Sequence, residues 1–206
     1  MVTYPLSYPT APGPQKLVLS ATNTIGMSKS PFTGQQQTYQ WPSEFFSLDV
    51  SLPPMLQATA QAWVAFLVAL RGQLGTFYAG DSSVLEPAGV ATGTPLVSGA
   101  QTAMSTSLTT KGWTAGVSNI LLAGDYIQLG TGVQQRLYKV LTNATSDGSG
   151  HATLDIFPRL REGVSDAQPI TTINCMGTFR LSSNERKWTV EEIQLYGVDF
   201  SAEEAF

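Results

Sequence analysis

Residues Glu44–Leu52 read EFFSLDVSL, which is the clearest strand pattern in the chain. Apolar side chains take every second position: Phe46, Leu48, Val50 and Leu52. Successive side chains of a strand point to opposite faces, so this pattern predicts a strand with one buried face and one polar face. Asp49 belongs to the polar face and should meet solvent in a cavity or groove.

One long helix is predicted over about residues 55–71, directly after this strand. Pro53-Pro54 ends the strand, because a proline cannot donate to a ladder, and the same residues can begin a helix. The apolar residues that follow are spaced by three or four: Leu56, Ala60, Trp63, Leu67 and Leu70. This spacing makes one apolar stripe, so Trp63 and Leu67 should be buried against a sheet. Arg71-Gly72 supplies the C-terminal stop.

Weaker strand patterns lie on both sides of this region. Upstream, Lys16–Ala21 and Gln35–Trp41 alternate on either side of a turn at Ser30–Gly34. Downstream, strands are predicted at 75–80, 125–129, 136–142 and 152–157, with a hairpin turn at 146–150 and a further strand pair near 170–173 and 178–181. Trp188–Phe200 is predicted as one strand with a bulge at Gly197, because the phase of its apolar residues changes there.

Residues 87–124 are the least clear part of the chain. Their single charged residue is Lys111, among Ser, Thr, Gly and Ala. Such a segment is either a flexible excursion or a run of weakly marked strands, and the pattern does not separate the two.

Composition favours a β-rich protein and gives no sign of nucleic-acid binding. Charged residues make up 13 % of the 206 residues, with 19 Gly and 12 Pro; an average soluble domain has roughly 25 % charged residues. The net charge of −4 offers no basic surface for phosphates. The longest strongly apolar run, 62–70, is about half the roughly 20 residues that span a bilayer, so no membrane insertion is expected.

The start of the chain and its cysteine content suggest where it is made. Residues 1–15 have neither a basic start nor an apolar stretch, so a signal peptide is not expected. The single cysteine, Cys175, excludes an intramolecular disulfide. Synthesis in a reducing cytoplasm is the expectation.

No catalytic, cofactor-binding or metal-binding set is predicted, so the chain is not expected to be an enzyme. His151 and Cys175 are the single histidine and the single cysteine, and neither lies in a nucleophile motif. Asp147–His151 resembles the start of a calcium loop but lacks the glycine and glutamate that this loop needs at its sixth and twelfth positions. Glu191 and Glu192 are adjacent, so in a strand they point to opposite faces and cannot act as a catalytic pair.

Several turn and packing motifs resemble the distal tail proteins of long-tailed bacteriophages. The motifs are SPFTGQQQ at 30–37, Trp41, LPPM at 52–55, GTFYAGD at 75–81, GDYIQLG at 124–130, YKV at 138–140 and Asp147-Gly148. The resemblance touches residues 30–81 and 120–182. It implies a mainly β fold: a tail-tube-like β-sandwich or barrel with one flanking helix, and an inserted small OB-like β-barrel. Together with the change of composition after Asp81, it predicts a ring (belt) domain at 1–81 and 177–206 and an inserted domain at 82–176.

The function that the resemblance implies is structural. Six copies would form a hexameric ring in the virion, at the tail tip, connecting the tail tube protein to the central hub protein of the baseplate. Such a protein would be made in the host bacterial cytoplasm and would need no cofactor. The alternative is a carbohydrate-binding or host-adhesion module that uses exposed aromatic residues of the inserted barrel.

The ring hypothesis predicts that DNA passes through the ring without specific binding. A basic wall would hold DNA, whereas an acidic wall repels it. The candidate lumen-facing residues are Glu44, Asp49, Glu191 and Glu192, beside or within the strands of the predicted ring domain. The other interpretation is that these acids lie on the outer surface and keep the protein in solution.

Overall fold

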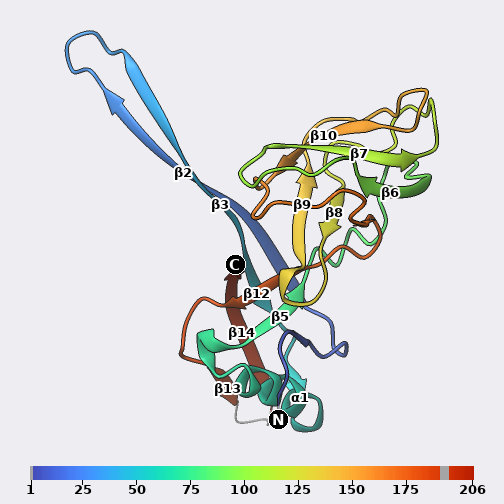
Figure 1. The fold of residues 1–206 in the computed structure, drawn as a ribbon. Coiled ribbons are helices and arrows are strands. Elements are labelled where there is room, and N and C mark those ends of the chain that lie inside the picture. The colour runs from blue at the N-terminus through green and yellow to red at the C-terminus, as the bar shows by residue number, and fades with distance from the viewer. Residues whose placement is uncertain (1, 191–194) are drawn as a thin grey trace.

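The computed structural model describes residues 2–190 and 195–206. These residues form two β-sheets and one α-helix, so the fold is mainly β, as predicted. Figure 1 shows the smaller sheet beside the upper part of the larger one, with the helix at the opposite end of the molecule.

The larger sheet has eight strands in the order β1-β5-β12-β14-β3-β2, with β4 and β13 paired to β14. Their bounds are β1 Leu6–Ser7, β2 Lys16–Lys29, β3 Gln36–Ser51, β4 Met55–Leu56, β5 Thr76–Ala79, β12 Gly177–Leu181, β13 Trp188–Val190 and β14 Leu195–Glu204. β1 and β5 are parallel, and the other pairs are antiparallel. The strand pattern at 44–52 therefore lies inside the sheet, between β14 and β2.

The smaller sheet has six strands in the order β11-β8-β9-β10-β7-β6 and is nearly closed into a barrel. Its strands are β6 Gly93–Val97, β7 Ser107–Trp113, β8 Tyr126–Leu129, β9 Arg136–Val140, β10 Ala152–Phe157 and β11 Ile170–Thr171. The two ends of the sheet approach each other: the Val97 amide donates to Gln168 O at 2.9 Å, and the Ala167 amide donates to Val97 O at 3.0 Å. Residues 87–124 thus include two strands, β6 and β7, so this segment is a run of weakly marked strands and not a flexible excursion.

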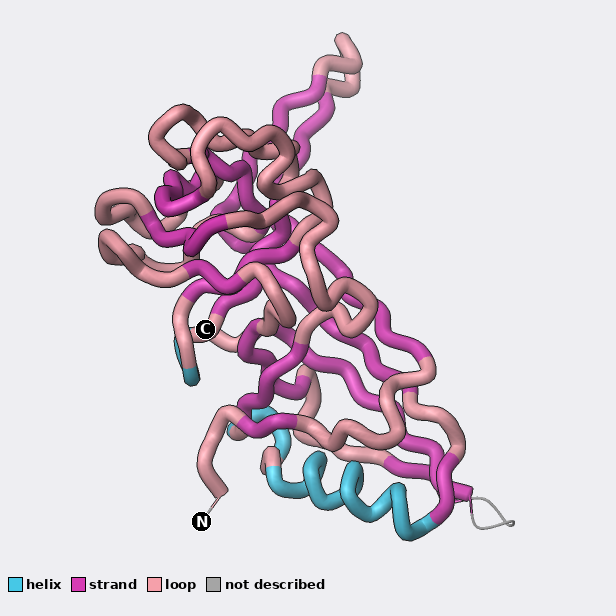
Figure 2. The backbone as a smooth tube through the Cα atoms, turned by 90° about the vertical axis from the view of Figure 1, so that its right-hand side faces the viewer, coloured by secondary structure: helices cyan, strands magenta, loops and turns pink. Residues whose placement is uncertain are grey.

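The helix α1, Gln57–Ala69, covers one face of the larger sheet, as Figure 2 shows. Trp63 and Leu67 are 0 % and 1 % exposed, so their predicted burial is confirmed. The Trp63 ring centroid lies 5.5 Å from that of Tyr8, 5.9 Å from that of Phe66 and 6.2 Å from that of Phe200. The helix, the N-terminal segment and the sheet therefore share one aromatic core.

A second core fills the barrel and is built from different residues. Its fully buried members include Leu108, Ile120, Ile127 and Leu154. All six barrel strands come from residues 93–171, while segments on both sides of that range supply the larger sheet. Independent folding of residues 82–176 remains a prediction.

Two strand predictions are wrong. Trp188–Phe200 is not one bulged strand: β13 pairs antiparallel with β14, and Gly197 lies opposite Thr189 in regular register. The change of apolar phase separates two strands and does not mark a bulge. The predicted strand pair near 170–173 and 178–181 belongs to two sheets, because β11 pairs with β8 while β12 pairs with β5 and β14.

Candidate functional site

A two-stranded arm, residues 22–43, projects beyond both sheets, as Figure 1 shows. It is formed by the far ends of β2 and β3, which pair continuously from Lys16 opposite Ser51 to Lys29 opposite Gln36, with one register shift between Asn23 and Ile25. Apart from Thr22 and Ser30, every residue of the arm is exposed. No other described strand covers either face of this ribbon.

The tip of the arm is closed by local hydrogen bonds. Ser30 Oγ accepts from the amides of Phe32 and Thr33 at 3.4 and 3.3 Å. Gly34 has a φ of 71°, a conformation that favours glycine, and its amide donates to Ser30 O at 3.0 Å. The turn predicted at 30–34 is confirmed, and β2 and β3 continue through segments that the sequence pattern divides into shorter strands.

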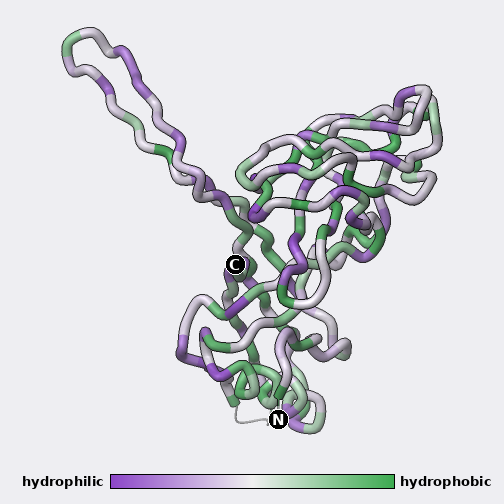
Figure 3. Tube along the Cα trace, in the orientation of Figure 1, coloured by the Kyte–Doolittle hydropathy of each residue, from purple (hydrophilic) through white to green (hydrophobic). Residues whose placement is uncertain are grey.

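Large apolar side chains occupy both faces and the tip of the arm. Ile25 and Met27, on one face, are 55 % and 65 % exposed. Tyr39 and Trp41 lie on the other face beside Gly26, with their rings edge-to-face and 4.9 Å apart between centroids. Phe32 at the tip is 94 % exposed. Figure 3 shows the arm as a mostly polar ribbon with a few apolar stretches.

The base of the arm is joined to the barrel by buried charges. Glu44, the first buried residue of β3 after the arm, is 4 % exposed. Its carboxylate accepts from Arg159 Nε at 3.1 Å, from the Arg159 amide at 2.9 Å and from Gln40 Nε2 at 2.8 Å. Because Arg159 follows β10, this ion pair connects the barrel to the larger sheet.

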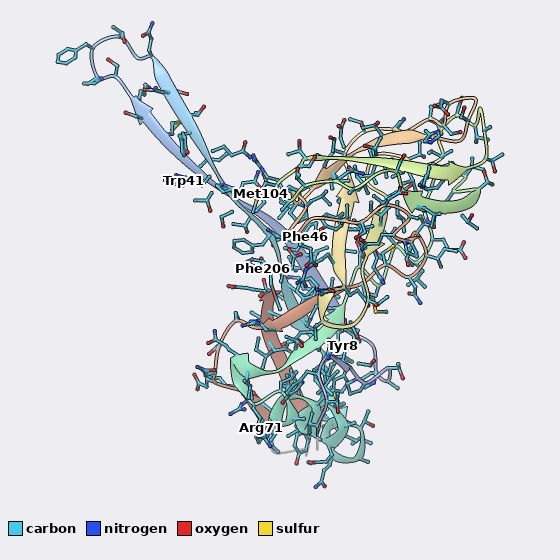
Figure 4. The ribbon with its side chains drawn as sticks, in the orientation of Figure 1. Tyr8, Trp41, Phe46, Arg71, Met104 and Phe206 are labelled. Atoms are coloured by element: carbon cyan, nitrogen blue, oxygen red, sulfur yellow. The ribbon has the colours of Figure 1, made fainter. Side chains whose placement is uncertain are left out.

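A second ion pair lies nearby at the same junction. Arg161 Nη2 donates to Glu204 Oε2 at 2.6 Å, and the Phe46 amide donates to the same oxygen at 3.4 Å. The Phe206 ring covers the Arg161 guanidinium at 4.4 Å. Figure 4 shows Phe46 and Phe206 together where the barrel meets the larger sheet. Arg136, at the start of β9, lies at the same junction, because its Nη1 donates to Ala205 O, next to Glu204, at 2.8 Å. We call Glu44, Arg136, Arg159, Arg161 and Glu204 the junction cluster.

The polar face of the larger sheet carries a band of charges. Asp49 is exposed, as predicted, and accepts from Ser201 Oγ at 2.5 Å. It lines a groove of about 370 Å³ together with Asp199, Arg186 and Lys187. Glu44, in contrast, turns its charge toward Arg159 and away from solvent.

The remaining predicted residues are placed as follows. Glu191 and Glu192 lie outside the described residues. His151 is exposed, and its Nδ1 is 3.8 Å from Asp147 Oδ1 in the turn at 147–150. Cys175 is buried, and burial raises the pKa of its thiol to about 12. Among residues 2–190 and 195–206, no group of three or more His, Cys, Asp or Glu side chains is placed to hold a metal ion.

The junction cluster has no signal in the sequence. Glu44 and Arg159 are 115 positions apart, and Arg161 and Glu204 are 43 apart. No local pattern relates residues at such separations, and each of these side chains taken alone is most often exposed. The arm had a partial signal, because the two alternating segments on either side of the turn were visible.

Comparisons add no relative to this picture. No protein-family model matches the chain, and no curated protein matches it. In the described part of the chain, no helix has the length and apolar character needed to cross a membrane.

Proposed function

We propose that the chain is a structural, non-enzymatic subunit that joins copies of itself into a hexameric ring at a bacteriophage tail tip. The ring would connect the tail tube to the central hub, in virions assembled in the cytoplasm of a bacterial host. The arm is the observation that carries the proposal. The resemblance at residues 30–81 and 120–182 supplies the biological setting.

The arm supports self-assembly because it needs a partner. A two-stranded ribbon is at best marginally stable in water, and this ribbon exposes apolar side chains on both faces. Strand β2 also ends the sheet, so its outer edge carries backbone groups without a strand beside them in the described structure. A second copy that covers the arm would make a head-to-tail contact, and such contacts close into rings when the rotation between copies permits.

The charges on the polar sheet face fit a wall that does not bind DNA. Asp49, Asp199 and Glu203 lie on this face, at paired or neighbouring positions of β3 and β14. Lys16 and Arg180 are basic residues of the strands on the same face. Glu185, Arg186 and Lys187 line the groove beside Asp49 and Asp199, so acidic and basic side chains balance on this side of the sheet. Without an excess of positive charge, a lumen lined by this face would not hold DNA.

The oligomeric state of the purified protein tests the proposal. Negative-stain microscopy and light scattering should show rings with six times the monomer mass. Met27→Asp should shift the population toward monomers, because a charge on the arm face cannot be buried against a neighbour without a large desolvation cost.

Leu141→Asp is the matched control, since Leu141 is 52 % exposed on the barrel against 65 % for Met27 on the arm. It should leave the rings unchanged. A wild-type protein that remains a monodisperse monomer at high concentration would contradict the ring and would favour the host-adhesion alternative.

A further inference from the structure

One buried arginine of the junction cluster has no counter-charge. Arg136, at the start of β9, is 9 % exposed. Its Nη1 donates to Val133 O at 3.1 Å and to Ala205 O at 2.8 Å, and its Nε is buried without a hydrogen-bond partner. Among the described residues, no carboxylate lies within salt-bridge distance of it. A buried charge in this situation is costly unless something neutralises it.

The other charges of the junction cluster are paired with each other and leave Arg136 without a partner. Glu44 is paired with Arg159, and Glu204 is paired with Arg161. Arg136 is therefore the arginine of the cluster that has no carboxylate partner among the described residues; Glu162, which lines a cavity beside it, is exposed and lies beyond salt-bridge distance.

A polar cavity of about 190 Å³ lies against this arginine. Beside Arg136, its polar lining includes Tyr138, Gln134, Ser165 and Gln168. The space is several times the roughly 30 Å³ that one water molecule occupies in the liquid, so a small organic group fits. We call it the Arg136 cavity.

Tyr138 adds a second donor to the cavity. Its hydroxyl oxygen accepts from the Arg161 amide at 3.3 Å, which leaves the phenolic proton free to be donated. Burial raises the pKa of Tyr138 to about 12, so the phenol keeps this proton at neutral pH. A guanidinium and a phenol in one cavity favour an acceptor that carries negative charge.

We propose that the Arg136 cavity binds a single carboxylate group, either from a small carboxylic acid or from an acidic side chain of a partner protein. A carboxylate accepts charge-assisted hydrogen bonds from a guanidinium and carries a single negative charge that can pair with Arg136. Glu162 also lines the cavity, and it would repel a phosphate dianion more strongly than a singly charged carboxylate. This site does not depend on the ring and would exist in a monomer.

Saturation-transfer NMR with acetate tests the proposal, because ligand-observed signals can be read for a monomer or a large assembly. The wild-type protein should bind acetate in phosphate-free buffer at constant ionic strength. Tyr138→Phe should weaken acetate binding about tenfold or more, as expected when a hydrogen bond to a charged group is lost. Arg136→Lys should also weaken it, because lysine has no planar fork.

A second variant avoids the buried residues Arg136 and Tyr138, whose replacement can also affect folding. Gln134→Ala combined with Gln168→Ala removes two amides at the cavity whose side chains make no hydrogen bond to other described residues, and it should weaken acetate binding without changing the circular dichroism spectrum. Arg180→Lys, at an exposed arginine of the larger sheet, is the control and should bind acetate as the wild type does.

A second ligand distinguishes the two possible sources of the carboxylate, a small acid and an acidic side chain of a partner. N-acetyl-glutamate amide that displaces acetate would indicate an acidic side chain of a partner, and acetate binding alone would indicate a small acid. Equal acetate binding by wild type, Tyr138→Phe and the double glutamine variant would overturn the site. Stronger binding of inorganic phosphate than of acetate would overturn its assignment to a carboxylate.

Discussion

Glu204 illustrates how a single residue connects the two halves of the molecule. Its side chain is 0 % exposed, it lies on β14 of the larger sheet, and its partner Arg161 belongs to the segment after the last long barrel strand. Neighbouring Glu203 is exposed on the opposite face. Two adjacent glutamates therefore have different roles, which their order in the sequence does not reveal.

Replacing Glu204 with Gln should destabilise the fold by about 3 kcal/mol, because it leaves the Arg161 guanidinium buried without its counter-charge. Glu203→Gln is the matched control and should change the free energy of unfolding by less than about 0.5 kcal/mol. Urea denaturation of both variants measures the difference. Equal stabilities would mean that the ion pair contributes nothing to holding the barrel on the sheet.

Leu67→Ala should cost about 2–5 kcal/mol of unfolding free energy, since it removes a buried side chain of α1 and leaves a cavity beneath it. The control, Val68→Ala, changes the next residue, which is 49 % exposed, and should cost far less. Thermal or urea unfolding followed by circular dichroism compares the two.

Cys175 should be unreactive in the folded protein. Its pKa is about 12 in the fold and about 9.0 as a free side chain, because burial disfavours the thiolate. Since the folded pKa is the higher one, the stability contributed by the neutral thiol is complete below pH 9 and is lost as pH rises from 9 toward 12. Iodoacetamide at pH 8 should label the native protein slowly and the urea-unfolded protein quickly; similar rates in both states would contradict this burial.

At the scale of elements, the sequence predicted those strands and helices whose apolar residues recur with a clear period. The strand at 44–52 and the helix α1 were readable because each buries one face against the same core. Barrel strands β6 and β7 were not readable, since their Gly, Thr and Ser residues carry little apolar contrast. The pairing of β13 with β14 was missed because a change of apolar phase fits a bulge in one strand and two separate strands equally well.

The arm should exchange its amide hydrogens much faster than the base of the same strands when the protein is monomeric. Residues 46–50 of β3 lie between two strands over a packed core, whereas residues 36–41 pair with one strand only and face solvent. In the assembled ring, amides of the arm should become protected. Hydrogen exchange by mass spectrometry on diluted and concentrated samples measures this, and an arm whose exchange is the same in both would not be an assembly element.

At the scale of the whole molecule, the barrel is inserted between two neighbouring strands of the larger sheet. Ala79, at the end of β5, lies directly opposite Gly177, at the start of β12. The two chain crossings are therefore adjacent, and a short linker can join them.

Removing residues 82–176, with a short Gly/Ser bridge from Asp81 to Gly177, should leave a folded core. The helix, its aromatic contacts and most of the larger sheet's core lie outside the deleted segment, although Tyr126, Leu137 and Cys175 of that core are lost. Circular dichroism and a cooperative thermal transition are the measurements. A spectrum of unfolded chain would show that the barrel is needed for the rest to fold.

The arm also has a mechanical consequence. A force applied to the tip of the arm is shared by the two covalent backbones of β2 and β3, so the ribbon can bear tension without breaking hydrogen bonds between its strands. The load passes into the body through the β3–β14 contact, where five residue pairs hold the strands together. Antiparallel hydrogen bonds run perpendicular to the strands, so a pull along β3 loads them in shear and they must fail together. An arm anchored in this way transmits force to the sheet without stretching.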